Sequence, residues 1–214
     1  MTVVASPPQL RALGRGTTVA LIVVSILAVA FLAIVAFPYF ALNQEQFGVY
    51  WPRRGWLLLH ITGGTAALLA GPVQLWLGLS DRRMDVHRRL GMAYMGAVAT
   101  SAFAAFYLAF NTDFGWAFGA GLTGLAVAWL VTTGMAFLAA RRFLFDQHKE
   151  WMIRSYVVTF AFVMFRIIFG IQQIPGVGVG TLQEQLATTI WTSWTVPLLL
   201  TEAVLQGRKI LAAH

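Results

Sequence analysis

Apolar residues dominate the chain in long runs that short polar segments separate. A helix needs roughly 20 mostly apolar residues to cross the hydrocarbon core of a bilayer. Six stretches meet this requirement, at about 17–38, 56–79, 91–110, 116–140, 151–172 and 186–206. They take up most of the chain and leave no room for a second soluble domain. The pattern predicts an all-α, polytopic integral membrane protein, with one bundle of six transmembrane helices that forms a single domain over residues 1–214.

The composition supports this interpretation. The chain has 214 residues, of which 58% are hydrophobic and only 11% are charged. This number of charged residues is too small to solvate the surface of a globular domain of this size. Lipid must therefore surround much of the protein surface. The chain has no cysteine, which excludes disulfides, thiolate metal sites, iron–sulfur clusters and thiol catalysis.

The first apolar run has an alternative interpretation as a signal peptide, because Arg11 and Arg15 precede it. The run is about 20 residues long, however, whereas the apolar part of a signal peptide has roughly 7–15. No clear small-x-small cleavage motif ends it. We therefore expect a retained first helix.

Basic residues predict the orientation, because they concentrate in the short cytoplasmic loops of membrane proteins. One side of the predicted bundle carries Arg11, Arg15, Arg82, Arg83, Arg88, Arg89, Arg141, Arg142, Lys149, Arg208 and Lys209. The other side carries only Arg53 and Arg54. Both termini are thus expected in the cytoplasm, for a multi-pass protein of the cytoplasmic (inner) membrane. The net charge of +7 indicates attraction of these loops to anionic lipid headgroups and no nucleic-acid binding.

Two of the cytoplasmic segments carry a similar histidine motif. One is DVHRRLGMAY, residues 85–94, and the other is DQHKEWMIRSY, residues 146–156. In each, an acidic residue stands two positions before the histidine, and a tyrosine follows about two helical turns later. The similarity indicates either an internal duplication of two hairpins or only the usual basic loop with an aspartate near a helix start. Both interpretations put His87 and His148 on the same side of the membrane.

A step of about 100° per residue puts polar and small residues on narrow helix faces. In the second run this face contains His60, Gly64, Ala67, Gly71, Gln74 and Gly78. It is either a glycine packing seam or one wall of a binding site, because small residues allow a close approach. In the fifth run the face contains His148, Ser155, Thr159, Phe162, Arg166 and Gln173.

Arg166 lies deep in the predicted fifth span, where an ionised side chain costs several kcal/mol without a partner. His60 and Tyr107 are expected at a similar depth. The outward half of the bundle can therefore hold a ligand site formed by His60, Gln74, Tyr107 and Arg166, for the binding or transport of a small anionic or lipid-like molecule. Arg154 lies one turn from the surface and can reach the interface with its long side chain.

Three sequence elements resemble those of a bacterial family of predicted membrane proteins, domain of unknown function 2306. They are His60 followed by Gly71-Pro72-x-Gln74, then HRRLGMAY, then HKEWMIRSY. The resemblance covers residues 56–170 and implies a polytopic bacterial membrane protein without an assigned activity. We expect residues 56–173 to form a functional core of four helices.

The predicted architecture is also similar to that of six-helix b-type cytochromes, which pair histidines of the third and fifth helices around one haem. This similarity implies a single haem b with His87 and His148 as axial ligands, because the fourth helix has no histidine for a second pair. The other residues of the predicted cofactor site are Arg88, Gly91, Tyr94 and Arg154. Basic groups would face the propionates, and the protein would exchange electrons with quinone or a membrane redox partner.

Two further functions stay open. His87 and His148 could bind a metal ion with Asp85, Asp146 and Glu150. Alternatively, the polar clusters only fasten helix ends, in a non-catalytic accessory or assembly subunit or a homo-oligomer. Four histidines, of which His214 is terminal, are fewer than membrane di-iron oxidases usually need. No Ser–His–Asp or paired-carboxylate arrangement appears at membrane depth, so the sequence assigns no enzymatic activity.

Overall fold

The computed structural model describes residues 13–212, so Arg11 and His214 lie outside the described residues. This part of the chain is helical throughout, without a strand, which confirms the all-α class. In chain order the elements are α1 (Arg15–Phe31), the π-helical turn η1 (Leu32–Ala36), the 3₁₀ turn η2 (Phe37–Ala41), α2 (Gln44–Phe47), the 3₁₀ turn η3 (Gly48–Arg53), α3 (Arg54–Leu79), α4 (Met84–Phe110), α5 (Trp116–Arg141), α6 (Phe145–Thr159), α7 (Ala161–Gln172) and α8 (Leu182–Ala212).

Within residues 13–212, four or five segments are suited to cross a membrane, whereas the sequence pattern predicts six. The four clear candidates are Arg15–Ala41, Gln44–Leu79, Met84–Phe110 and Trp116–Arg141. The fifth is α6 with α7, which meet at a bend of 41°. The predicted sixth span, 186–206 in α8, is not among them, because threonine and serine make this helix less apolar. The protein is thus a membrane protein with multiple apolar helices.

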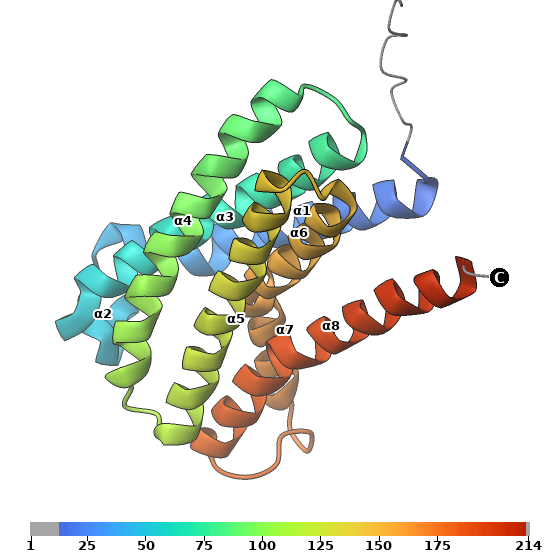
Figure 1. The fold of residues 1–214 in the computed structure, drawn as a ribbon. Coiled ribbons are helices and arrows are strands. Elements are labelled where there is room, and N and C mark those ends of the chain that lie inside the picture. The colour runs from blue at the N-terminus through green and yellow to red at the C-terminus, as the bar shows by residue number, and fades with distance from the viewer. Residues whose placement is uncertain (1–12, 213–214) are drawn as a thin grey trace, which may run out of the picture.

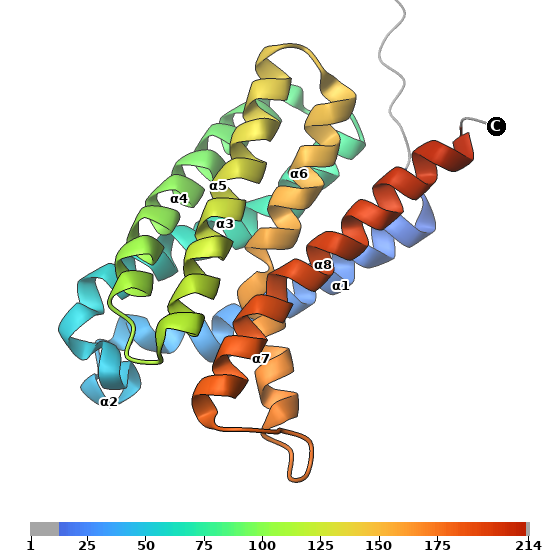
Figure 2. The same ribbon diagram turned by 60° about the horizontal axis from the view of Figure 1, so that its bottom comes forward.

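Helices α3, α4, α5 and α6 pack in sequence, each against the next (Figures 1 and 2). Their shared core contains Tyr94 and Val98 of α4, Trp129 of α5 and Val158 of α6. Glycine allows α3 and α4 to approach closely, since a Cβ on Gly63 would lie 2.7 Å from the carbonyl oxygen of Ala97. The remaining core is completed by the first half of α8, which packs on α5 and α7.

The helix break at Phe160 separates α6 from α7 and is visible in Figure 2. No proline or glycine occurs there. The hydroxyl of Thr159 instead donates a hydrogen bond to the Ser155 carbonyl at 2.8 Å, and such backward bonds bend helices. The predicted polar face from His148 to Gln173 is therefore interrupted, and Arg166 lies exposed on α7.

Helix α8 begins with a capping box. The Thr181 hydroxyl accepts a hydrogen bond from the Glu184 backbone N–H at 3.4 Å, and the Glu184 carboxylate accepts one from the Thr181 backbone N–H at 2.7 Å. These bonds satisfy N–H groups that the first turn of a helix leaves free. The pKa of Glu184 is lowered below its usual range, mainly by the hydrogen bond from the Thr181 backbone and secondarily by the one from the Thr181 hydroxyl.

Candidate functional site

The two histidine motifs meet at one end of the bundle. His87 lies in the first turn of α4 and His148 in the first turn of α6. Their ring centres are 6.0 Å apart and the rings are almost perpendicular, at 89°. The third contributor, Gln74 of α3, is 2% exposed. Side chains from three helices thus converge on one small volume.

A hydrogen bond fixes the tautomer of the neutral His148 ring. Its Nδ1 lies 2.8 Å from the carbonyl oxygen of Ala136 in α5. Because a carbonyl only accepts, Nδ1 carries the proton of the neutral ring. In this tautomer Nε2 carries a lone pair, and a neutral imidazole nitrogen of this kind can bind a metal ion.

The Gln74 side chain joins α3 to α4, and its hydrogen-bond partner in α4 determines which way its amide group is turned. The Nε2 group donates to the carbonyl oxygen of His87 at 2.8 Å. Two glycines make this contact fit. A Cβ on Gly91 would lie 3.1 Å from Gln74 Nε2, and one on Gly78 would lie 3.0 Å from His87 Cε1. Gly91, predicted to admit a cofactor, instead admits the Gln74 amide.

A cavity of about 20 Å³ lies between these side chains. Its walls are formed by Gln74, Leu75, Gly78, Leu79, His87, His148, Lys149 and Met152. Two buried polar atoms at this site, Gln74 Oε1 and His87 Nδ1, have no hydrogen-bond partner among the described residues. Buried polar atoms normally have one. The volume suits one water molecule or one monatomic ion.

The same volume decides against a haem in this arrangement. Sites for small organic ligands and cofactors have volumes of roughly 300 Å³ or more, whereas this cavity has about 20 Å³. Arg88, predicted to face the propionates, is exposed. The residues present therefore do not fit a macrocycle between His87 and His148.

The predicted acidic ligands do not join the histidines. Within residues 13–212, no three or more His, Cys, Asp and Glu side chains are grouped so that they could hold a metal ion. Asp85 and Asp146 are exposed. Glu150 pairs with Arg154 at 3.4 Å and with Lys209 at 2.8 Å. Any ion at this site would depend on neutral ligands.

Arg154 is bound by other side chains of the protein. It is 7% exposed. Its Nε donates to the Glu202 carboxylate of α8 at 2.8 Å, and its guanidinium lies 4.8 Å from the Trp151 ring centre. A buried arginine requires such a partner. Arg154 thus fastens α8 to α6, away from the histidine pair.

Tyr94 belongs to a buried group of hydroxyls in the core. Its hydroxyl lies 2.8 Å from Ser155 Oγ and 2.7 Å from Thr159 Oγ1. Thr159 also accepts from the Trp129 indole at 2.8 Å, and Ser155 contacts Thr133 at 2.7 Å. This hydroxyl cluster is internally satisfied, and it explains why polar residues on α4, α5 and α6 can be buried.

The four residues of the predicted outward ligand site lie apart or bind other partners. His60 Nδ1 is 3.0 Å from the Ser101 carbonyl oxygen, so this histidine links α3 to α4. Tyr107 stacks on Trp56 with ring centres 4.5 Å apart. In the described part of the chain, no hydrogen bond or ion pair joins His60, Tyr107 and Arg166. Gln74 belongs to the histidine pair instead.

Sequence reasoning missed two contributors to the site. Met152 follows His148 by four residues, and this spacing puts both on one helix face, so Met152 could have been identified. The Ala136 carbonyl could not have been identified, because every residue has a backbone carbonyl. Only the packing of α5 on α6 puts this one next to His148.

Comparisons with known proteins give one match. A family model described as predicted membrane protein (DUF2306) matches residues 57–205, more than half of the chain. The match includes Gln74, both histidines and Met152. No curated protein and no solved structure match.

Proposed function

The chain belongs to the DUF2306 family of predicted membrane proteins, and on that premise we propose that it binds a single transition-metal ion between His87 and His148. One observation carries the proposal. Two imidazoles with ring centres 6.0 Å apart line a cavity of ionic size, beside two buried polar atoms that have no hydrogen-bond partner in the part of the chain that the structure describes.

The separation of the rings supports the proposal. A metal–nitrogen bond of about 2 Å puts the ring centre roughly 3 Å from the ion, so two imidazoles on one ion have centres about 5–6 Å apart. The observed 6.0 Å is within this range. Histidines that bind a metal ion usually donate their other ring N–H to a carbonyl or carboxylate, which fixes the ring and its tautomer. The bond from His148 Nδ1–H to the Ala136 carbonyl is of this kind.

The neutral ligands favour copper(I) over a divalent ion. Met152 adds a thioether to the cavity wall, and Lys149 adds a positive charge. Soft thioether and imidazole ligands suit Cu⁺. A nearby ammonium opposes a divalent ion more than a monovalent one. Gln74, whose Oε1 has no hydrogen-bond partner among the described residues, also lines the cavity and would be a fourth ligand.

Two other functions stay predictions from the sequence. A haem between the same histidines requires α3, α4 and α6 to move apart from a cavity of about 20 Å³. Binding or transport of an anion by Arg166 and His60 requires a rearrangement that brings these residues together, because His60 is held by Ser101.

Metal content and the absorption spectrum of the purified protein test the proposal. After purification with Cu⁺ under reducing conditions and removal of loosely bound ions, we expect about one copper per chain and no Soret band. A Soret band with stoichiometric iron would replace the metal-ion site by a haem site. Less than about one tenth of an ion per chain, with Cu⁺ or with Zn²⁺, would contradict the metal-ion site.

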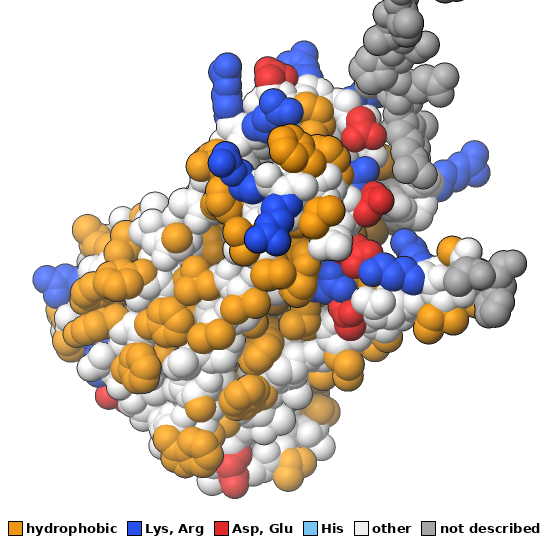
Figure 3. All heavy atoms as spheres, in the orientation of Figure 1, with side chains coloured by type: hydrophobic (Ala, Val, Ile, Leu, Met, Phe, Trp, Pro, Cys, Tyr) orange, Lys and Arg blue, Asp and Glu red, His pale blue; other side chains and the backbone are white. Residues whose placement is uncertain are grey.

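For the membrane topology, we propose six spans with both termini in the cytoplasm of a bacterial cell, in the cytoplasmic (inner) membrane. The hydroxyls of Thr188, Thr192 and Thr195 in α8 donate hydrogen bonds to carbonyls four residues earlier. These bonds lower the free-energy cost of moving the hydroxyls from water into the membrane, which supports α8 as a sixth span. Figure 3 supports the orientation, because Lys and Arg side chains gather at the end that holds the α3–α4 and α5–α6 loops.

Single cysteines test this topology, because the chain has none of its own. A membrane-impermeant maleimide should label Thr112→Cys and Val179→Cys in intact cells. Asp146→Cys and Arg208→Cys should react only after the membrane is opened. Labelling of Val179→Cys and Arg208→Cys from the same side would show that α8 does not span the membrane.

A further inference from the structure

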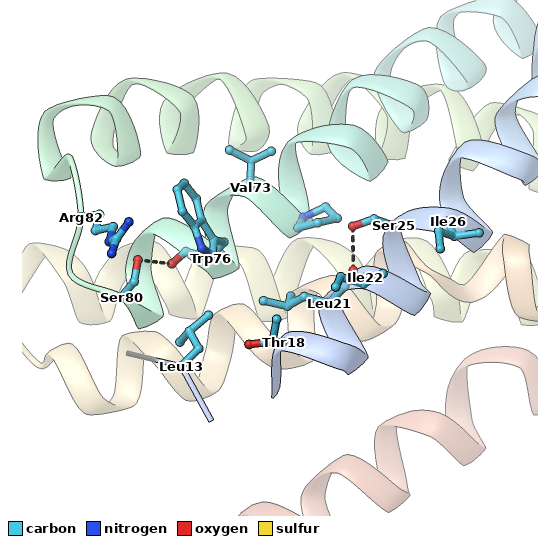
Figure 4. A pocket seen from close by; sticks show the side chains of 11 residues that line it. Leu13, Thr18, Leu21, Ile22, Ser25, Ile26, Val73, Trp76, Ser80 and Arg82 are labelled. Carbon is cyan, nitrogen blue, oxygen red and sulfur yellow. Dashed lines mark hydrogen bonds between the residues drawn. The ribbon is translucent and has the colours of Figure 1, made fainter. Parts of the chain in front are cut away.

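A groove opens between α1 and α3 (Figure 4). The second half of the first span packs tightly, since Ala28, Leu32 and Ala36 are buried against Tyr156 and Phe160. Its first half leaves the bundle, and the groove beside it has a volume of about 650 Å³. This volume is typical of a binding site for an organic molecule.

The walls of the groove suit hydrocarbon. Its apolar lining consists of Leu13, Leu21, Ile22, Ile26, Pro72, Val73 and Trp76. The three hydroxyls in the lining already bond to their own helices, those of Ser25 and Ser80 to carbonyls at 2.7 and 2.6 Å and that of Thr18 at 3.3 Å. They therefore offer little to a polar ligand and do not oppose an apolar one.

The end of the groove at the α3–α4 loop is cationic. Arg82 lines it, with its guanidinium carbon 5.9 Å from the Trp76 ring centre (Figure 4). The ion pairs among the described residues do not include Arg82. Asp81 and Asp85 are outnumbered at this loop by Arg82, Arg83, Arg88 and Arg89. An anionic group next to the groove mouth therefore meets a positive field.

The length of the groove matches one leaflet. Its lining on α1 extends from Thr18 to Ile26, which is about 12 Å along a helix, against roughly 15 Å for half of the hydrocarbon core. Trp76 lies beside Arg82, as tryptophan commonly does at the membrane interface. An apolar slot of one leaflet with a cation at its interfacial end matches the shape and charge of an anionic phospholipid.

We propose that this groove is a phospholipid site, which holds one acyl chain against α1 and α3 and the phosphate against Arg82. The site is independent of the metal ion proposed above. It also gives α1 a reason to splay, because a lipid chain replaces the protein contacts that this half of the helix lacks.

Native mass spectrometry of the full chain in detergent tests the proposal, with phosphatidylglycerol and phosphatidylcholine of identical acyl chains as probes. The wild type should retain one phosphatidylglycerol, with a preference of about five-fold, the typical contribution of one arginine near a charged surface. Arg82→Gln should remove the preference. Val73→Trp, which fills the groove, should lower retention of both lipids. Arg142→Gln, an equal charge change on the α5–α6 loop, should have no effect.

Four results would overturn the proposal. Equal retention of both lipids by the wild type would exclude recognition of the phosphoglycerol charge. Equal losses in Arg82→Gln and Arg142→Gln would indicate diffuse attraction to a basic end. Retention that Val73→Trp leaves unchanged, or a dimer without bound lipid, would mean that the groove is not a lipid site.

Discussion

Replacement of His148 by alanine is expected to weaken Cu⁺ binding by more than about 100-fold. Loss of an outer-shell partner alone typically costs 10–100-fold in metal affinity, and this change removes a direct ligand. It also leaves the Ala136 carbonyl without its side-chain partner. His87→Ala should have an effect of similar size, because the cavity lies between the two rings. Competition with a chromogenic Cu⁺ chelator measures both.

A matched control separates loss of the ligand from loss of the fold. His60→Asn removes an imidazole from α3 but keeps a side-chain N–H for the Ser101 carbonyl, and it should leave Cu⁺ affinity unchanged. Met152→Leu should weaken Cu⁺ more than Zn²⁺, because only the softer ion gains from a thioether. If His148→Ala and His60→Asn weaken Cu⁺ binding equally, the histidine pair is not the site.

The largest effect on stability is expected for Gly71→Ala. An added methyl group would overlap the Tyr156 ring edge and lie 3.0 Å from its Cζ. The ring has little freedom to move, because it is buried and its hydroxyl donates to the Leu68 carbonyl at 3.1 Å. Overpacking of this kind typically costs about 1–3 kcal/mol. Thermal unfolding in detergent should therefore begin at a clearly lower temperature.

Two further variants make this result specific. Gly96→Ala puts the same methyl group on α4 where, apart from the neighbouring residues and backbone of α4 itself, no atom of the described residues lies within 4 Å. Stability should therefore hold or rise slightly, because alanine favours helix. In a Tyr156→Ala background, Gly71→Ala should cost almost nothing, and a double-mutant cycle measures this coupling. Equal costs in both backgrounds would disprove the contact as the cause.

Much of the fold could be predicted, because lipid imposes long apolar helices. The ends of the predicted runs 56–79 and 116–140 agree closely with α3 and α5. The convergence of His87 and His148 follows from two loops on one side of a small bundle. The predictions became less accurate where helices are irregular. At the bend, the Thr159 hydroxyl bonds back to the Ser155 carbonyl and also meets Trp129 and Tyr94, and these tertiary partners cannot be predicted from the local sequence.

The sequence could not predict which side chains contact each other across different helices. Gln74 shares a helix face with His60, so periodicity alone put both in one site. The offset between α3 and α4 decides instead that Gln74 meets His87 and that His60 meets Ser101. Arg154 likewise binds Glu202, which is 48 residues away in the sequence. Helical periodicity within one segment contains no information about such pairs.

The X-ray absorption spectrum of the copper-loaded wild type measures the central claim most directly. We expect two imidazole nitrogens at about 2.0 Å from Cu⁺, with a longer sulfur contribution that disappears in Met152→Leu. A copper environment with one imidazole or none, or the same spectrum in the His87→Ala, His148→Ala double variant, would contradict the proposal that this histidine pair binds the ion.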